Sequence, residues 1–460
     1  MFAPVRAAWA LFLGVALMML GGGLQSSLLG VRAELEGFPT TATGVIMSAY
    51  FVGFLLGSLI VPRLIGRVGH VRVFAALASL ASASALAHVI FIEPATWTAM
   101  RLITGFAYAG LYIVAESWLN DRATNRTRGG LLAVYMVVLM GGTAGGHLLL
   151  NLDSPSGFHL FALVSVLVSV SLIPLLLARA PAPAFGRPHP VGLGELYRAS
   201  PLGVVGCFGT GIVHGAALGM GAVYAGSAGL SVAEISVFMG AVYLGGMLLQ
   251  WPIGRLSDRF DRRLVLTGTT LLAAAAAVGA LAAAQVSTSA LIALIGLFGG
   301  LTLPMYALCI SHTNDFLRPE QMTAASGRLY MVTGVGSTLG PIGVAQAMGL
   351  VGPQGYFVFL AGVHTAIGVF ALWRMTRRAA RPLAEQGHCA TIAAAGAQVA
   401  VAMAAEDAAE HQLDADVAKT DASRDGWMAE ADAAVLRATL DPTAPLPQPA
   451  NDTGESERVA

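Results

Sequence analysis

Twelve separate apolar runs, each long enough to cross a lipid bilayer as a helix, dominate the chain. A bilayer core of about 30 Å requires about 20 apolar residues per helix, and backbone without internal hydrogen bonds is not tolerated against lipid. Hydrophobic residues make up 56% of the 460 residues and charged residues only 11%, which is too little polar surface for a soluble domain. We therefore predict an all-α membrane protein. The predicted spans are approximately 8–30, 43–65, 71–92, 95–118, 129–151, 158–178, 201–224, 232–255, 263–284, 288–311, 323–349 and 355–376.

Arginines divide the connections between these spans into two classes. Connections that follow even-numbered spans contain fourteen arginines, whereas those that follow odd-numbered spans contain only Arg32. Positively charged residues concentrate in cytoplasmic loops, so we expect both termini to be cytoplasmic and the protein to lie in a plasma membrane, the inner membrane of a bacterium. The distribution also supports the number of spans, because one missed or invented span would mix the two classes.

A change in charge marks a predicted boundary near Arg378. Residues up to this point hold 21 arginines and 12 acidic residues, and the remainder holds 5 basic and 14 acidic residues. We expect the remainder to be a largely disordered, alanine-rich cytoplasmic tail, with a marginal helix within 406–440. The predicted organisation is a six-helix bundle at 1–178, a cytoplasmic linker at 179–200, a second six-helix bundle at 201–378 and the acidic tail at 379–460.

The two halves of the membrane region repeat each other. The sequence PRLIGRVG at 62–69 aligns with GRLSDRFD at 254–261, at an offset of 192. Asn-Asp at 120–121 recurs at 314–315, and Tyr-Met-Val at 135–137 recurs at 330–332. Two repeats with the same orientation predict a substrate pathway between the halves, with rocking of one half against the other.

Glycines at helical spacing support a packed bundle. Helices in lipid gain little from hydrophobic association, so they pack closely where small residues let their backbones approach. Ordinary helix packing explains these glycines better than a binding site does. The pairs and triplets with this spacing are Gly53 with Gly57, Gly211 with Gly215 and Gly219, and Gly336 with Gly340.

Short motifs over about residues 5–378 resemble the signatures of the major facilitator superfamily. The family pattern G-x-x-x-D-[RK]-x-G-[RK]-[RK] is most complete after the eighth span, where Asp261 replaces its second glycine. The counterpart in the first half keeps Arg67 and Gly69 but has Pro62 and Gly66 where the Gly and Asp belong. The matching residues after the eighth span are Gly254, Asp258, Arg259, Arg262 and Arg263.

Two further signatures of the family concern helix interiors. An arginine four residues before a glycine on the fourth span matches Arg101 and Gly105. The antiporter signature G-x-x-x-G-P-x-x-G-G lacks its proline on the fifth span, which leaves the direction of transport open. The resemblance implies two six-helix bundles of the family fold. The glycine-rich residues concerned are Gly141, Gly142, Gly145 and Gly146 on the fifth span and Gly336, Gly340, Pro341 and Gly343 on the eleventh.

Arg101 and Glu116 are charged residues inside the fourth predicted span. An arginine at a helix centre costs roughly 2.5–3.5 kcal/mol on insertion, so Arg101 requires compensation. We interpret it as a coupling or anion-binding group that faces the central cavity, and the alternative is snorkelling or an interhelical hydrogen bond. Glu116 lies about 22 Å further along the helix, too far for a direct pair. For Glu116 we expect an ion pair with Arg67 at the gate, or proton binding.

Several other polar residues within spans are candidates for the cavity. Histidine changes charge most readily near neutral pH, and His214 is favoured because the seventh helix lines the cavity in the family. A histidine in a span is otherwise a hydrogen-bonded structural residue, which is the alternative for His147 and His364. We expect Arg328, at the start of the eleventh span, to pair with Asp258. The remaining candidates are Gln25, Tyr108, Tyr112, Tyr224 and Tyr306.

Sequence motifs for other chemistry are absent. The chain has no G-x-x-x-x-G-K-[ST] loop for ATP, no H-E-x-x-H or cysteine cluster for a metal, and no G-x-S-x-G nucleophile. We therefore expect no enzyme activity, no cofactor, no nucleic acid partner and a monomer in the bilayer. The predicted function is secondary active transport of a small-molecule substrate by alternating access, coupled to protons. The alternative is a non-transporting sensor or scaffold of the same fold that acts through its acidic tail.

Overall fold

The computed structural model describes residues 5–6, 8–124, 126–177, 192–383, 386–387, 389, 398–411 and 413. Residues 1–409 form one compact unit and residues 410–460 a second. No β-strand occurs among the described residues, and 12 helices are long and apolar enough to span a membrane, all of them in the first unit. The predicted all-α fold with twelve spans is thus confirmed. The elements are α2 (Trp9–Leu35), α3 (Thr40–Val68), α4 (His70–Ile90), α5 (Pro94–Arg122), α6 (Arg128–Leu148), η1 (Leu149–Leu152), α7 (His159–Leu177), α8 (Leu193–Ala199), α9 (Pro201–Ser227), α10 (Val232–Arg259), α11 (Arg262–Ala283), α12 (Thr288–Thr302), α13 (Met305–Asn314), α14 (Pro319–Val351) and α15 (Gly355–Arg377).

The tenth span is broken in its middle, which the sequence prediction of one helix over 288–311 does not include. Helix α12 ends at Thr302 and α13 begins at Met305. Pro304 lies in the break, where it has no backbone N–H to donate and its ring disfavours a continuous helix. The break leaves the Thr302 carbonyl available to a side chain, and His214 approaches it (Nε2 to O, 3.1 Å).

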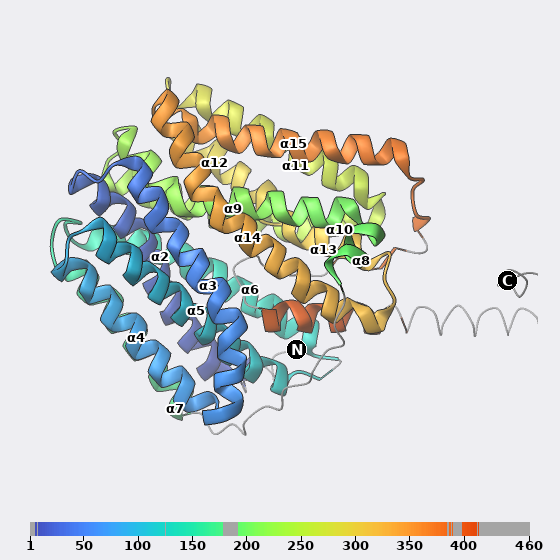
Figure 1. Ribbon diagram of the computed structural model, residues 1–460, viewed down its shortest axis with the longest axis horizontal. Coiled ribbons are helices and arrows are strands. Elements are labelled where there is room, and N and C mark those ends of the chain that lie inside the picture. Colours follow the sequence, from blue (N-terminus) through green and yellow to red (C-terminus); the bar gives the residue numbers. More distant parts are fainter. Residues whose placement is uncertain are drawn as a thin grey trace, which may run out of the picture. The chain divides into compact units, whose positions relative to one another are not determined.

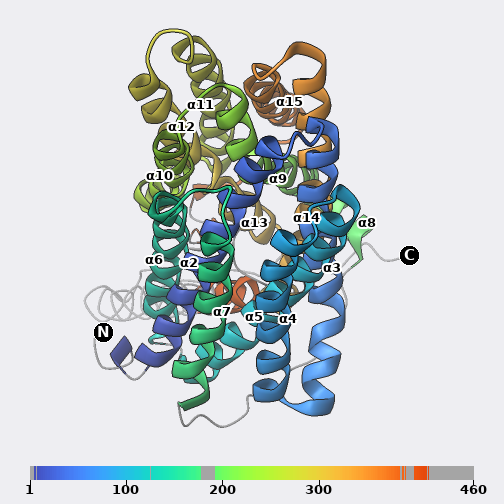
Figure 2. The same ribbon diagram turned by 90° about the vertical axis from the view of Figure 1, so that its left-hand side faces the viewer.

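Figure 1 and Figure 2 show α2–α7 gathered in one group of helices and α9–α15 in another. Glycines allow close packing within each group, as their spacing predicts. A Cβ added to Gly53 of α3 would overlap the Leu102 carbonyl of α5. Gly245, 192 residues later, has the same relation to the Gly296 carbonyl of α12, so the sequence repeat reappears as a repeated helix contact.

The two groups contact each other directly at the end of the spans where α2 ends and α3 begins, which we call the closed end. The Ser48 hydroxyl of α3 donates to the Thr338 carbonyl of α14 (2.7 Å), and the Asn151 side chain donates to the Ser236 hydroxyl of α10 (2.7 Å). Gly44 of α3 lies so close to α14 that an added Cβ would be 2.9 Å from a backbone oxygen. The closed end carries the connections that are poor in arginine.

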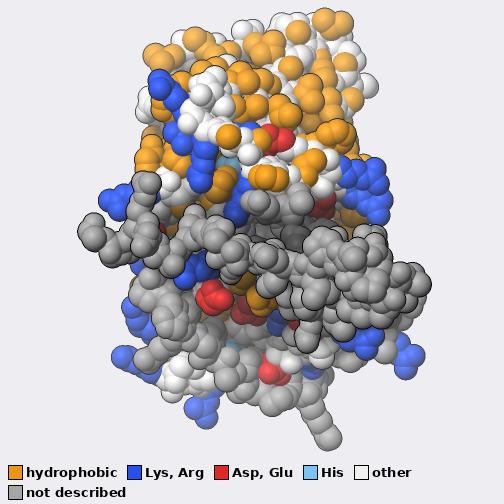
Figure 3. Space-filling model, turned by 90° about the vertical axis from the view of Figure 1, so that its right-hand side faces the viewer, with side chains coloured by type: hydrophobic (Ala, Val, Ile, Leu, Met, Phe, Trp, Pro, Cys, Tyr) orange, Lys and Arg blue, Asp and Glu red, His pale blue; other side chains and the backbone are white. Residues whose placement is uncertain are grey.

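At the opposite, arginine-rich end, a helix from beyond α15 lies between the two groups. It comprises residues 398–409 of the first unit and is the dark orange segment between the two groups in Figure 1. Ala400, Val401, Met403, Ala404 and Ala405 are each at most 2% exposed. Figure 3 shows Lys and Arg side chains (blue) distributed over the face that contains this end. We call residues 398–409 the tail helix.

Candidate functional site

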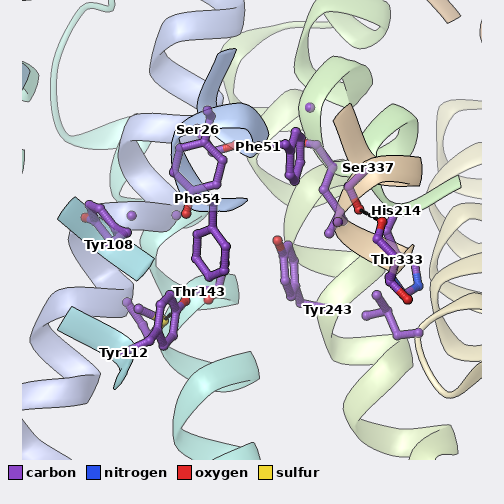
Figure 4. Close-up of a pocket in the computed structure, with 18 of the residues that line it drawn as sticks. Ser26, Phe51, Phe54, Tyr108, Tyr112, Thr143, His214, Tyr243, Thr333 and Ser337 are labelled. Carbon is purple, nitrogen blue, oxygen red and sulfur yellow. Dashed lines mark hydrogen bonds between the residues drawn. The ribbon is translucent and has the colours of Figure 1, made fainter. Parts of the chain in front are cut away.

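A cavity of about 170 Å³ lies between the two groups of helices, at the middle of the spans. Helices α2, α3, α5 and α6 form one side, and α9, α10, α13 and α14 form the other (Figure 4). Among the described residues its lining contains one cation, Arg101, and no Asp or Glu. The polar lining residues are Gln25, Ser26, Tyr50, Arg101, Tyr108, Tyr112, Thr143, His214, Tyr243, Tyr306, Tyr330, Thr333 and Ser337.

Arg101 is the charged group of this cavity. It lies two turns into α5, is only 5% exposed, and its guanidinium carbon is 4.4 Å from the centre of the Tyr50 ring. No carboxylate of the described residues pairs with it, and its Nε atom has no hydrogen-bond partner. A cation over an aromatic face gains about 0.5–2 kcal/mol, which is less than the cost of its desolvation. Arg101 is thus only partly compensated by the protein.

Three other buried groups at the cavity also have no hydrogen-bond partner. They are the Nε2 atom of Gln25 on α2, the hydroxyl of Tyr108 on α5 and the hydroxyl of Tyr306 on α13. An unsatisfied buried polar group costs about 1–3 kcal/mol, so four of them around one cavity are expensive for the fold. A ligand or ordered water in the cavity can complete the hydrogen bonds of such groups.

Aromatic rings form much of the cavity wall. The Phe54 ring centre lies 5.9 Å from that of Tyr112 and 6.5 Å from that of Tyr330, and Tyr50 lies 6.4 Å from Tyr108. Phe54 and Tyr330 come from different groups of helices, so the wall continues across the interface. Figure 4 shows Phe54 between Tyr112 and Tyr243.

Six of the seven substrate or coupling candidates come together at this cavity. Glu116 does not line it and lies one turn beyond Tyr112 on α5. Its carboxylate accepts hydrogen bonds from the Tyr135 hydroxyl (2.9 Å) and from the backbone N–H of Ala400 in the tail helix (2.8 Å). The candidates that line the cavity are Gln25, Arg101, Tyr108, Tyr112, His214 and Tyr306.

The predicted ion pair between Glu116 and Arg67 is wrong. Glu116 is fully buried, whereas Arg67 is exposed in the last turn of α3 and makes no ion pair among the described residues. The predicted ion pair of Arg328 with Asp258 is also wrong. Arg328 is exposed on α14, and the Asp258 carboxylate accepts instead from the backbone N–H of Cys389 (2.7 Å).

The motif after the eighth span forms an ionic cluster at the arginine-rich end. Arg262 is 1% exposed and donates to both oxygens of Asp315 (2.7 Å), the residue that follows α13. Burial raises the pKa of Asp315 to about 6, although Arg262 lowers it. Arg263 pairs with Asp261 (2.8 Å), and Arg259 and Gly254 belong to the last turns of α10. In the first half, Gly69 is the C-terminal cap of α3, with a φ of 87° that suits glycine.

Histidines and one tyrosine outside the cavity have structural partners. The Nδ1 atom of His147 is 2.6 Å from the Ser27 hydroxyl, and both ring nitrogens of His364 lie within 3.0 Å of threonine hydroxyls. The Tyr224 ring stacks on that of Tyr356 (4.7 Å).

The sequence did not identify several cavity residues, among them Tyr50, Phe54, Tyr243 and Tyr330. A tyrosine inside a span was the available signal, but tyrosines such as Tyr224 also serve packing. The positions of Tyr50 and Tyr243 differ by 193 residues, which lies within the offsets of the internal repeat. The repeat therefore could have identified them as equivalent positions in the two halves.

A model of the Major Facilitator Superfamily matches residues 11–313 and 205–419 of the chain. A protein described as an uncharacterised MFS-type transporter, YcaD of Escherichia fergusonii, is 28% identical over 381 residues, which cover 82% of this chain and 98% of that protein. The YcaD of Salmonella paratyphi A is 28% identical over 365 residues, covering 79% and 94%.

Solved transporter structures share the fold. The nucleoside transporter NupG superposes with a TM-score of 0.65 at 13% identity, covering 81% of this chain and 99% of that one. A bacterial homologue of the human lysosomal transporter Spinster, in an inward-facing and unoccupied conformation, superposes with a TM-score of 0.62 at 15% identity, covering 88% and 98%. At these identities the likeness concerns the fold alone.

Proposed function

Because the chain belongs to the Major Facilitator Superfamily, we propose that it is a secondary active transporter that carries a small solute across the bacterial inner membrane by alternating access. The observation that carries the proposal is the cavity between the two groups of helices, with the buried, unpaired Arg101 in its wall. A protein that only required a stable bundle would gain from an apolar residue here, because an uncompensated buried charge destabilises the fold. A bound solute accounts for its presence.

The two ends of the interface support alternating access. The halves contact each other directly at the closed end, and only the opposite end holds the tail helix between them. With the arginine-rich connections in the cytoplasm, this is a conformation that opens inward once the tail helix is absent from the interface. Rocking of the halves about the cavity would then open the closed end.

We assign the role of proton carrier to Glu116. It is the carboxylate that is fully buried within a span among the described residues, and it contacts both α6 and the tail helix. Ionisable residues within spans are costly and typically mark ion pathways. Without a phosphate-binding loop in the sequence, an ion gradient is the available energy source.

Proteoliposomes that contain the full chain and a trapped pH-sensitive dye test the proposal. Addition of a transported solute should acidify the lumen when proton and solute enter together, and a protonophore should abolish solute accumulation. Glu116→Gln should stop gradient-driven accumulation and retain exchange of solute at equal pH. The expected direction of accumulation also depends on how the protein is oriented in the vesicle membrane. Labelling of Arg126→Cys and Asp153→Cys from opposite membrane faces determines this orientation.

The alternative is a sensor or scaffold that does not transport. The tail helix contacts both halves, so a conformational change of the membrane region would move it. If no solute in a broad panel of metabolites and drugs gives gradient-dependent flux, while solute binding alters release of the tail helix, the sensor function replaces the transporter function.

A further inference from the structure

We propose that the cavity takes a small organic monoanion, a carboxylate carried on a single ring, with Arg101 as the residue that pairs with the carboxylate. This assignment rests on the transporter function proposed above and names its substrate class.

Charge is the first reason. Arg101 supplies one positive charge to the cavity, and no acidic side chain of the described lining offsets it. A guanidinium is always protonated and offers a planar fork of donors that matches a carboxylate. A neutral solute would leave this charge unpaired in a desolvated site, and a cationic solute would be repelled. A dianion would leave one of its two negative charges without a cationic partner in this lining.

The unpaired hydrogen-bonding atoms give the second reason. The Nε2 atom of Gln25 and the Nε atom of Arg101 can only donate, and both are buried without partners. The hydroxyls of Tyr108 and Tyr306 are also without partners and can donate. A ligand that satisfies these groups must be rich in acceptor oxygens, as a carboxylate is.

Size and the aromatic wall give the third reason. An engineered cavity of about 150 Å³ holds one benzene molecule, so this cavity of about 170 Å³ accommodates one ring with a small substituent. Tyr50 and Phe54 from one group of helices and Tyr243 from the other line the cavity and would contact such a ring. Aromatic pairs of this kind contribute about 0.5–1.5 kcal/mol beyond simple burial.

Thermal unfolding of the purified full chain with benzoate, benzamide and benzylamine tests the charge preference. The three probes share one ring and differ in charge. Benzoate should raise the unfolding temperature, because a ligand that binds only the folded state stabilises it, and the other two should not. Arg101→Gln should lose the benzoate effect, while Arg72→Gln, an exposed arginine outside the cavity, should retain it.

Tyr108→Phe removes one donor and keeps the ring, so it provides the test if Arg101→Gln does not fold. The benzoate concentration that gives half of the maximal shift should rise about tenfold or more in Tyr108→Phe, because a hydrogen bond to a charged group is lost. Equal shifts with benzoate and benzamide, a shift with benzylamine, no benzoate shift at all, or an unchanged benzoate shift in Arg101→Gln would each overturn the assignment.

Flux measurements separate this assignment from the transporter function. Gradient-dependent uptake of a neutral or cationic solute would support the transporter function and contradict the assignment of an anionic substrate. Binding of benzoate that depends on Arg101, without flux in proteoliposomes, would support the anion site and contradict the transporter function.

A separate observation concerns the tail helix, which reaches the route between the cavity and the arginine-rich end. In the first half, the Gln398 amide donates to the Ser58 carbonyl (2.9 Å), and Ala400 donates to Glu116. On the other side, Ala405 packs in an apolar cluster with Met322 of α14, in the second half, and with Leu196 of α8, which precedes it. The tail helix therefore contacts both halves.

The contacts of the tail helix lie next to the cavity along two of its lining helices. Ser58 follows the cavity residue Leu55 by three positions on α3, and Glu116 follows Tyr112 by four on α5. Four residues are about 6 Å of helix.

From this placement we infer that the tail helix is an autoinhibitory plug that closes the cytoplasmic route to the cavity. It also occupies space that the two halves need when the arginine-rich end closes. The chain ahead of it is anchored, because the Cys389 N–H donates to Asp258 beside the Arg262–Asp315 pair. The plug is thus held on a fixed point of the second half.

Thiol labelling of Ser58→Cys in inside-out vesicles tests the plug, with Cys389→Ser as background. Ser58 is 1% exposed and lies under Gln398, so a bulky impermeant maleimide should label it slowly. Ala404→Arg places a cation at a position that is 2% exposed and should expel the tail helix, increasing the labelling rate about tenfold or more, which corresponds to about 1.4 kcal/mol.

Ala402→Arg is the matched control, since Ala402 lies on the less buried face of the same helix, and it should leave the rate unchanged. Val401→Asp is a second expelling variant that uses the opposite charge. Fast labelling of Ser58→Cys in the otherwise unchanged chain would contradict the plug, as would equal rates in Ala404→Arg and Ala402→Arg.

Discussion

The two ends of the interface between the halves are sealed in different ways. At the closed end, small residues such as Gly44 bring backbones of opposite halves together, and Ser48 and Asn151 add hydrogen bonds across the interface. At the arginine-rich end, a separate helix contributes the contact and makes polar links to Glu116 and Ser58. The closed end can open only if the halves move, whereas the other end can open by release of the tail helix alone.

This difference implies two independent controls on one cavity. In the proposed cycle, movement of the halves would change the side of the membrane from which Arg101 is accessible. The tail helix would determine whether the arginine-rich side is open. The following substitutions disturb one end at a time.

The largest effect is expected from Gly44→Leu at the closed end. An added Cβ meets Ala345 and the Pro341 carbonyl of α14, and overpacking typically costs about 1–3 kcal/mol. Because only the conformation with a closed end bears this cost, the equilibrium should shift toward the opposite conformation by about 5- to 150-fold. Labelling of Ser48→Cys by an impermeant maleimide in right-side-out vesicles should accelerate accordingly.

Gly66→Leu is the control for this prediction, because a Cβ on Gly66, in the same helix α3, meets no atom within 4 Å. Unchanged labelling in Gly44→Leu, or equal acceleration in both variants, would show that the closed end is not maintained by close packing.

A smaller effect is expected from release of the tail helix. Ala404→Arg should increase the initial rate of gradient-driven benzoate uptake into inside-out vesicles about tenfold, if the plug costs the transporter about 1.4 kcal/mol. Ala402→Arg should retain the original rate. A loss of uptake in Ala404→Arg with normal expression would instead make the tail helix a required part of the transport cycle.

Weakening the anchor of the tail helix should have a milder effect. Asp258→Asn removes the charge that accepts from the Cys389 N–H, a hydrogen bond worth about 1 kcal/mol. The labelling rate of Ser58→Cys should rise about fivefold, less than with Ala404→Arg. An exposed acid elsewhere, Asp121→Asn, serves as the comparison. A rate that does not differ between the two variants would argue against an anchor at Asp258.

The smallest effect concerns pH and the buried Arg262–Asp315 pair at the arginine-rich end. The folded-state pKa of Asp315, about 6, lies above its ordinary value of 3.8. The folded protein therefore binds this proton more tightly than the unfolded chain, and stability from this group is lost as pH rises from about 4 to about 6. Asp315→Asn should flatten that part of the profile of unfolding temperature against pH. A steeper profile in Asp315→Asn would reverse the assigned sign.

The membrane fold was predictable because its signals are local. Each span needs only about 20 apolar residues, the arginines separate the connections, and glycines such as Gly53 show where backbones meet. The cavity was predictable in part for the same reason, since a polar residue such as Arg101 or Gln25 inside a span is costly unless it has a purpose. Tyrosines of the wall gave no such signal, because a ring with a hydroxyl also suits packing.

Long-range pairs were not predictable from the sequence. Glu116 was assigned to Arg67 because both lie near the same membrane face, but one of its observed partners, the backbone N–H of Ala400, is 284 residues away along the chain. The described part of the tail helix, from residue 398, lies partly ahead of the stretch 406–440 in which the sequence indicated a helix. Its alanine-rich sequence is too short for a span, and its partner is a surface formed jointly by both halves.

Electron paramagnetic resonance distances at both ends provide the most direct test of alternating access. One spin-label pair, Leu35→Cys with Leu350→Cys, reports the closed end, and another, Val68→Cys with Leu264→Cys, reports the arginine-rich end; all four positions are exposed. In liposomes with benzoate at pH 5.5 and 7.5, a second population should appear in which the first distance lengthens as the second shortens. Distances that stay single at both ends under every condition, or that change in the same direction, would contradict a cavity reached alternately from the two sides.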